Sequence, residues 1–153
     1  MLENLIDSFK DQLSSKISES GVSTDKVDDI VKLSGSSMSE ELMSKASSGG
    51  MDSVLSLFTD ESSTNSSNSI VQGIVGNLTG KLSSSLGMDA GTANGLASKI
   101  IPYIIDMLGD KFRKSDSSND AAGLAEFAGL DAGGMIEKAK GLLGGKLGGL
   151  FGK

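Results

Sequence analysis

The N-terminal residues carry apolar side chains at intervals of three and four, with charged residues between them. At about 100° per residue, these apolar positions fall on one arc of about 120° of a helix surface. They are Leu2, Leu5, Ile6, Phe9, Leu13 and Ile17. The pattern predicts an N-terminal helix with a single buried stripe.

Glycine and serine positions divide the rest of the N-terminal half, residues 1–58. Gly21 is placed to end the first helix in a left-handed conformation, and Ser23 is placed to cap a second helix. Two further short helices are expected, one after the serine-rich stretch and one after Gly49 and Gly50. The apolar positions of these three helices are Val27, Ile30 and Val31, then Met38, Leu42 and Met43, then Met51, Val54, Leu55 and Phe58.

Residues 59–69 are almost entirely small and polar or acidic, and they offer nothing to bury. They predict a polar linker. A second helical half, residues 70–114, follows and opens with a new apolar stripe that ends at Gly87. This stripe comprises Ile70, Val71, Ile74, Val75, Leu78, Leu82 and Leu86.

Asp89 is placed to cap a long helix after that stripe. The helix carries Ile100, Ile101, Ile104, Ile105, Leu108 and Phe112. Its apolar arc widens to about 200°, so we expect it to be central, with neighbours on two sides. Pro102 lacks an amide donor and its ring clashes with the preceding turn, so it is expected to kink or interrupt this helix.

Residues 115–153 are predicted to contain a second polar linker, a short alanine-rich helix through Leu124 and Phe127, and a glycine-rich tail. Residues 21–23, 87–89 and 129–131 each place an apolar residue between a helix-ending glycine and a capping side chain. Such joints are common in helical proteins, so a duplicated unit and ordinary connections both stay open. The predicted fold is all-α: a small helical domain of two related multi-helix halves.

Residues 21–27 (GVSTDKV) and 41–51 (ELMSKASSGGM) resemble the first unit of a bacterial domain-of-unknown-function family that includes the YidB-like proteins. Residues 82–89 (LSSSLGMD), followed by Ile101 and Pro102 and then Leu108 and Gly109, resemble its second unit. The Gly-Leu-rich end is similar to the ends of those proteins. The resemblance implies an all-helical fold and brings no catalytic residue with it.

The formal charge of −6 argues against sequence-independent binding of nucleic acid, because such binding needs Lys and Arg to displace counterions from the phosphates. The chain contains no Cys and no His, so it lacks a thiol nucleophile and the commonest general base and metal ligand. No apolar run reaches the ~18 residues of a membrane span, and Glu3 and Asp7 do not suit a signal peptide. We expect a cytoplasmic protein without nucleic acid, cofactor or small-molecule ligand.

Three patterns could carry chemistry. Residues 23–26 match S-x-x-K, in which a lysine activates a serine, but its companion motifs are missing and Ser23 also suits a cap. Residues 60–64 and 116–120 alternate oxygen ligands as calcium loops do, without the required glycine and glutamate. The adjacent acidic pairs at 28–29 and 40–41 point about 100° apart on a helix and cannot readily share one metal ion. No catalytic, cofactor or metal site is predicted.

The tail presents large apolar residues on one side of a helical wheel and six glycines opposite. The candidate interaction residues are Met135, Ile136, Leu142, Leu143, Leu147, Leu150 and Phe151. Repeated G-x-x-x-G spacing allows close approach of backbones. A frayed terminus, docking on the chain's own core, self-association and contact with a membrane surface all stay open for this segment. The leading function is a non-enzymatic helical interaction protein that self-assembles into a homo-oligomer; a peripheral membrane protein and a serine hydrolase are the alternatives.

Overall fold

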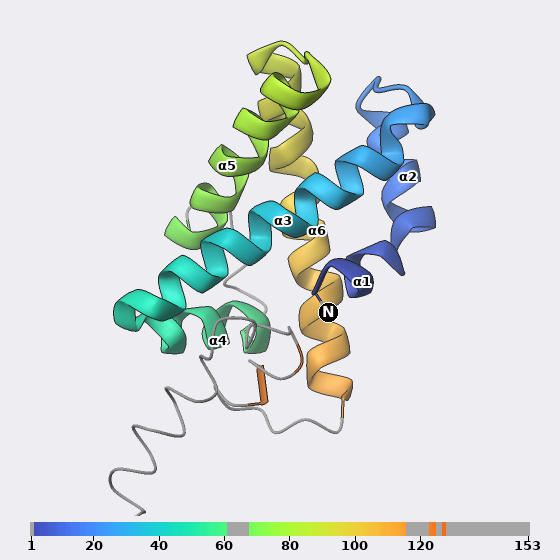
Figure 1. The fold of residues 1–153 in the computed structure, drawn as a ribbon. Coiled ribbons are helices and arrows are strands. Elements are labelled where there is room, and N and C mark those ends of the chain that lie inside the picture. The colour runs from blue at the N-terminus through green and yellow to red at the C-terminus, as the bar shows by residue number, and fades with distance from the viewer. Residues whose placement is uncertain (1, 61–67, 116–122, 125–126, 128–153) are drawn as a thin grey trace, which may run out of the picture.

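The computed structural model describes residues 2–60, 68–115, 123–124 and 127, and this part is all-helical, as predicted (Figure 1). The first half contains α1 (Leu2–Asp7), α2 (Lys10–Glu19), the 3₁₀ turn η1 (Thr24–Lys26), α3 (Val27–Lys45), the π turn η2 (Ala46–Gly50) and α4 (Met51–Thr59). The second half contains α5 (Ser69–Leu86) and α6 (Ala90–Lys114).

The predicted single N-terminal helix is wrong, because the chain breaks between α1 and α2. The Ser8 hydroxyl donates to the Leu5 carbonyl at 2.5 Å, and the Phe9 amide bonds only three residues back, to Ile6. A serine hydroxyl that competes for backbone carbonyls disturbs a helix in this way. The apolar stripe still faces the core on both sides of the break, since its buried residues are Ile6, Phe9, Leu13 and Ile17.

Helix α3 is continuous where a separate short helix through Met38 and Leu42 was expected. The serine-rich stretch does not interrupt it, because Ser34 and Ser37 are fully buried within the helix. The Ser34 hydroxyl donates to the Ile30 carbonyl at 2.7 Å and so needs no outside partner. Serine in the middle of α3 is therefore part of the interior and not a linker.

The predicted helix ends are largely confirmed. Gly21, Gly49 and Gly87 have φ of 78°, 89° and 65°, in the left-handed region where glycine is favoured. Asp89 caps α6 by accepting from the Thr92 amide at 2.9 Å. Ser23 adopts the extended backbone of a cap, but its hydroxyl bonds the Asp25 carboxylate and no backbone amide.

Pro102 does not interrupt α6, which runs unbroken from Ala90 to Lys114. The helix is central, as predicted, and packs against α5, α4, α2 and α1. Its large buried side chains are Leu96, Ile100, Ile101, Ile104, Ile105, Leu108 and Phe112. Burial of these residues on several sides holds the helix together past the missing amide of the proline.

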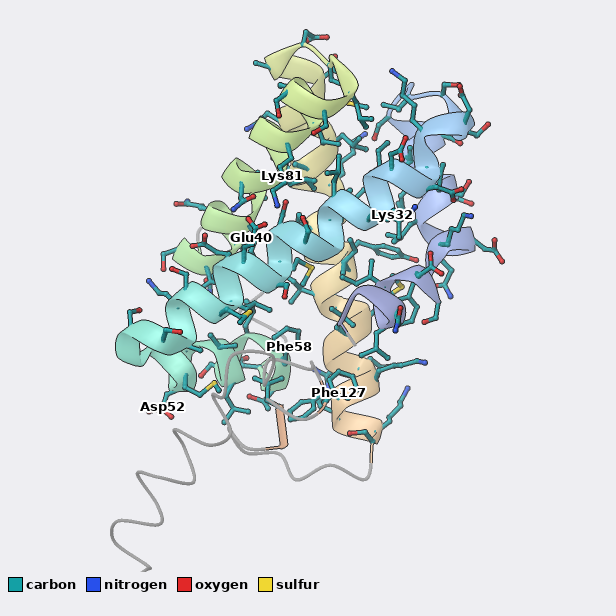
Figure 2. The ribbon with its side chains drawn as sticks, in the orientation of Figure 1. Lys32, Glu40, Asp52, Phe58, Lys81 and Phe127 are labelled. Carbon is teal, nitrogen blue, oxygen red and sulfur yellow. The ribbon has the colours of Figure 1, made fainter. Side chains whose placement is uncertain are left out.

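One hydrophobic core joins the two halves. It contains residues of every α-helix from α1 to α6 and the fully buried Leu124. Helix α3 packs on α5, and α4 packs on α6, so each half covers apolar surface of the other. Phe127 packs on the Phe112 ring with centroids 5.3 Å apart, beside the C-terminal end of α6 (Figure 2).

Candidate functional site

Exposed glycines gather on the hairpin formed by α5 and α6. Gly76 and Gly80 lie one turn apart on α5, and Gly91 and Gly95 lie one turn apart near the start of α6. All four are exposed. We call these four residues the glycine face.

The interior of the bundle does not require these glycines. A Cβ built on Gly76, Gly80 or Gly95 would have no heavy atom within 4 Å, and one on Gly91 would meet only Asp89 Oδ2, at 3.3 Å. By contrast, a Cβ on Gly109 would lie 2.9 Å from the Phe58 carbonyl oxygen. A glycine inside a helix costs about 1 kcal/mol relative to alanine. The glycine face therefore carries a cost that packing within the described bundle does not explain.

A groove of about 310 Å³ lies between α5 and α6 beside the glycine face. Its lining residues are Val71, Gln72, Val75 and Gly76 of α5, and Asn94, Ser98 and Pro102 of α6. Ser98 and Pro102 follow Gly91 and Gly95 at helical spacing, so they share one side of α6. The groove has apolar walls and neutral polar edges.

Charge is nearly absent from α5 and from the first part of α6. Between Ser69 and Ser98 the only charged residues are Lys81 and Asp89. Asp89 is occupied as the cap of α6, and the hydrogen bonds from Thr92 hold the pKa of its carboxyl below the usual range. The exposed side of a typical soluble helix carries many more charges.

Lys81 is directed toward α3 and leaves the glycine face neutral (Figure 2). Its Nζ donates to Glu40 Oε1 and to Ser36 Oγ, both at 2.6 Å. Asn77 adds a longer bond of 3.4 Å to Glu40 Oε2. The hydrogen bond from Lys81 lowers the pKa of Glu40, although burial partly opposes this shift. This cluster fastens α5 to α3.

A serine beside a lysine can act as a nucleophile only if the lysine accepts a proton. Lys81 Nζ donates to both Ser36 Oγ and Glu40 Oε1, so it is not placed to take the proton of the Ser36 hydroxyl. In the predicted S-x-x-K motif, the Ser23 hydroxyl bonds Asp25. Neither serine is arranged as an activated nucleophile.

The acidic residues of α3 contact several neighbouring helices. Asp28 pairs with Lys10 of α2, and Glu40 pairs with Lys81 of α5. Glu41 lies against Gly73, where an added Cβ would collide with its carboxylate. Within the described residues, no group of three acidic side chains is placed to hold a metal ion.

Two further hollows flank Lys32 and Leu33 of α3. One, of about 510 Å³, lies toward α1 beside Asn4 and Asp7. The other, of about 290 Å³, lies toward the end of α5. Both mix charged and apolar walls and contain no converging set of ligands.

The predicted interaction residues of the tail, from Met135 to Phe151, lie outside the described residues, as do most residues of the two proposed calcium loops. A role for G-x-x-x-G spacing was predicted only in the tail. The same spacing at 76–80 and 91–95, together with the scarcity of charge between residues 69 and 98, is the sequence signal that could have predicted the glycine face.

Comparisons with protein-family models, with curated proteins and with solved structures find no match for this chain. The resemblance to the family of YidB-like proteins stays a prediction. In the part of the chain that the structure describes, no helix is both long and apolar enough to cross a membrane.

Proposed function

We propose that this protein is a non-enzymatic helical interaction protein that assembles with copies of itself through the glycine face. The observation that carries the proposal is the presence of Gly76, Gly80 and Gly95 in exposed helix, with open space where their side chains would be. The glycines lower the stability of the helices at this surface, and the surface also carries little charge. Both features suit a partner that packs closely against it.

A second copy fits this surface because the face complements itself. In a two-fold dimer the same patch meets its own image, so each pair of glycines can receive a helix of the other copy. The missing side chains let the two backbones approach, and the absence of charge removes repulsion and desolvation costs. The apolar walls of the groove supply area to bury.

The chemistry of the chain supports a role without catalysis. Ser36 accepts a hydrogen bond from Lys81, and the Ser23 hydroxyl bonds the Asp25 carboxylate. We propose that the protein acts in the cytoplasm. Membrane association through the tail is the competing function, and co-sedimentation with anionic liposomes would favour it over self-assembly.

The test is the mass in solution as a function of protein concentration, measured by light scattering. Gly76→Glu places a charge opposite its own image in the dimer, and glutamate is a better helix former than glycine. We expect a bundle at least as stable as the wild type that associates about tenfold more weakly or worse.

Ser18→Glu, at an exposed position of α2, is the control, because it adds the same charge on a helix that does not line the groove. It should leave the association unchanged. A wild-type protein that is monomeric at all concentrations, or a Gly76→Glu variant that associates normally, contradicts the proposal.

A further inference from the structure

We infer that two copies of this chain meet with their α6 helices antiparallel, and that the Asn94 amide of each copy donates to the Ser98 backbone carbonyl of the other. The inference rests on the proposed function and deepens it, since it names the contact that fixes how the second copy lies on the glycine face. Both residues line the groove between α5 and α6.

The acceptor is a backbone carbonyl that has lost its helical donor. In a regular α-helix the carbonyl of residue 98 accepts from the amide of residue 102. Pro102 has no amide hydrogen, yet α6 runs unbroken through this position. Ser98 is exposed, and both residues line the groove. The Ser98 carbonyl oxygen therefore lies on the side of α6 that faces the groove.

The donor lies one turn earlier on the same helix. Asn94 is exposed, and its Oδ1 accepts from Ser98 Oγ at 3.4 Å. Its Nδ2 carries two N–H donors, and neither donates to an atom of the described residues. The edge of the groove thus offers a donor and an acceptor that are four residues apart.

These two groups complement each other across a two-fold axis. In a two-fold dimer, residue i of one copy meets residue j of the other, and j meets i. Two antiparallel α6 helices that cross midway between Asn94 and Ser98 bring each Asn94 beside the Ser98 of the other copy. One crossing therefore forms two identical hydrogen bonds, whereas parallel helices would bring like residues together.

The sizes of the residues on this side of α6 agree with the same register. Pro102 follows Gly91 by eleven residues, which is three helical turns, so both lie on one side of α6. The antiparallel crossing places the Pro102 ring of each copy over Gly91 of the other. A Cβ added to Gly91 would meet only Asp89 Oδ2 within its own chain, so there is space for the ring.

Light scattering of two single variants and their double variant tests the hydrogen bond. Asn94→Leu keeps the size of the side chain and removes the donor, and Pro102→Ala returns an amide hydrogen that can occupy the Ser98 carbonyl within its own helix. Each should weaken association about tenfold, because two hydrogen bonds are lost per dimer. Pro102→Ala should also raise the melting temperature at a concentration where the protein is monomeric. The double variant should associate about as weakly as Pro102→Ala alone, since both changes remove the same bonds.

Asn4→Leu is the matched control, because it makes the same exchange at an exposed position of α1 that does not line the groove. It should leave association unchanged. If Asn94→Leu associates as Asn4→Leu does, or if the effects of Asn94→Leu and Pro102→Ala add in full, the inference is wrong and self-assembly through the glycine face still stands.

Cross-linking tests the register, because the natural chain contains no cysteine. Ser98→Cys would be treated with a short bis-maleimide at a concentration where the wild type associates, and we expect a link between two chains. Lys114→Cys is the control, since its two copies lie about 50 Å apart when antiparallel α6 helices cross midway between Asn94 and Ser98.

Absence of a link at Ser98→Cys, or an equal link at Lys114→Cys, would mean that the copies meet in another register, which overturns the inference but not the proposed function. A wild-type protein that is monomeric at every concentration would overturn both.

Discussion

Glycine has opposite roles at different positions of this bundle, and the surroundings of each missing side chain distinguish them. At Gly109 the Phe58 carbonyl comes so close that a methyl group does not fit. At Gly76 and Gly80 nothing approaches, so the cost of glycine is not recovered by packing within the described bundle. Gly109 is therefore required for helix packing within the bundle, whereas Gly76 and Gly80 are available for contact with a partner.

Replacement of Gly76 and Gly80 by alanine should therefore stabilise the isolated bundle. Each substitution removes a helix penalty of about 1 kcal/mol and introduces no clash. Gly109→Ala is the matched comparison and should destabilise by about 1–3 kcal/mol, because α4 and α6 must move apart. Urea unfolding at a concentration where the protein is monomeric measures both. A loss of stability in the Gly76 and Gly80 variant would mean that their surroundings are more crowded than described.

The Glu40 and Lys81 pair gives a prediction for pH. The pKa of Glu40 is lowered in the folded protein from its usual value of 4.5, so its stabilisation is complete above that value and is lost as pH falls through the folded pKa. Both side chains are partly exposed, which limits the effect to about 0.2–1 kcal/mol. Glu40→Gln should lower stability by this amount at pH 7 and by nothing at pH 2. An equal loss at both values would indicate a steric effect and not a charge effect.

At the level of helices, the local sequence predicted where helices end better than it predicted whether they continue through an unfavourable residue. Gly87 and Asp89 were identified correctly because a left-handed residue and a capping oxygen depend only on adjacent backbone. The expected break at the serine-rich stretch of α3 and the expected interruption at Pro102 were wrong, because the effect of these residues depends on what packs around them. The sequence of a single helix does not show whether a serine hydroxyl will be buried and bonded to its own helix. Nor does it show whether neighbouring helices will pack around a proline on several sides.

Helix α6 is the element on which both halves pack, and this makes Ile104 a sensitive position. Its side chain is fully buried, so Ile104→Asp places an unpaired carboxylate in the core. The cost is several kcal/mol against a total stability of about 5–15 kcal/mol. We expect loss of the cooperative thermal transition in far-ultraviolet circular dichroism. Lys99→Asp, on the exposed side of the same helix, should melt nearly as the wild type does; an unchanged transition for Ile104→Asp would show that α6 is not central.

At the level of the whole molecule, the two halves predicted from the polar linker share their apolar surfaces. The core is continuous across both halves, and polar contacts also cross between them. Arg113 of α6 donates to the Phe58 carbonyl at the end of α4, and Lys81 of α5 bonds Glu40 of α3. The sequence predicted the apolar stripes correctly, but stripes do not specify their partners. Composition alone therefore could not show whether the linker joins two cores or two parts of one core.

Separate production of residues 1–60 and 68–153 distinguishes these two arrangements. A fragment of about 60 residues can bury only about 60% of its surface, and this one would also expose the α3 and α4 surfaces that pack on α5 and α6. We expect each fragment alone to show weak helicity and no cooperative melting. An equimolar mixture should regain the helical spectrum and a single transition, because every contact of the core is again present. Cooperative melting of either fragment by itself would show that the halves are independent domains.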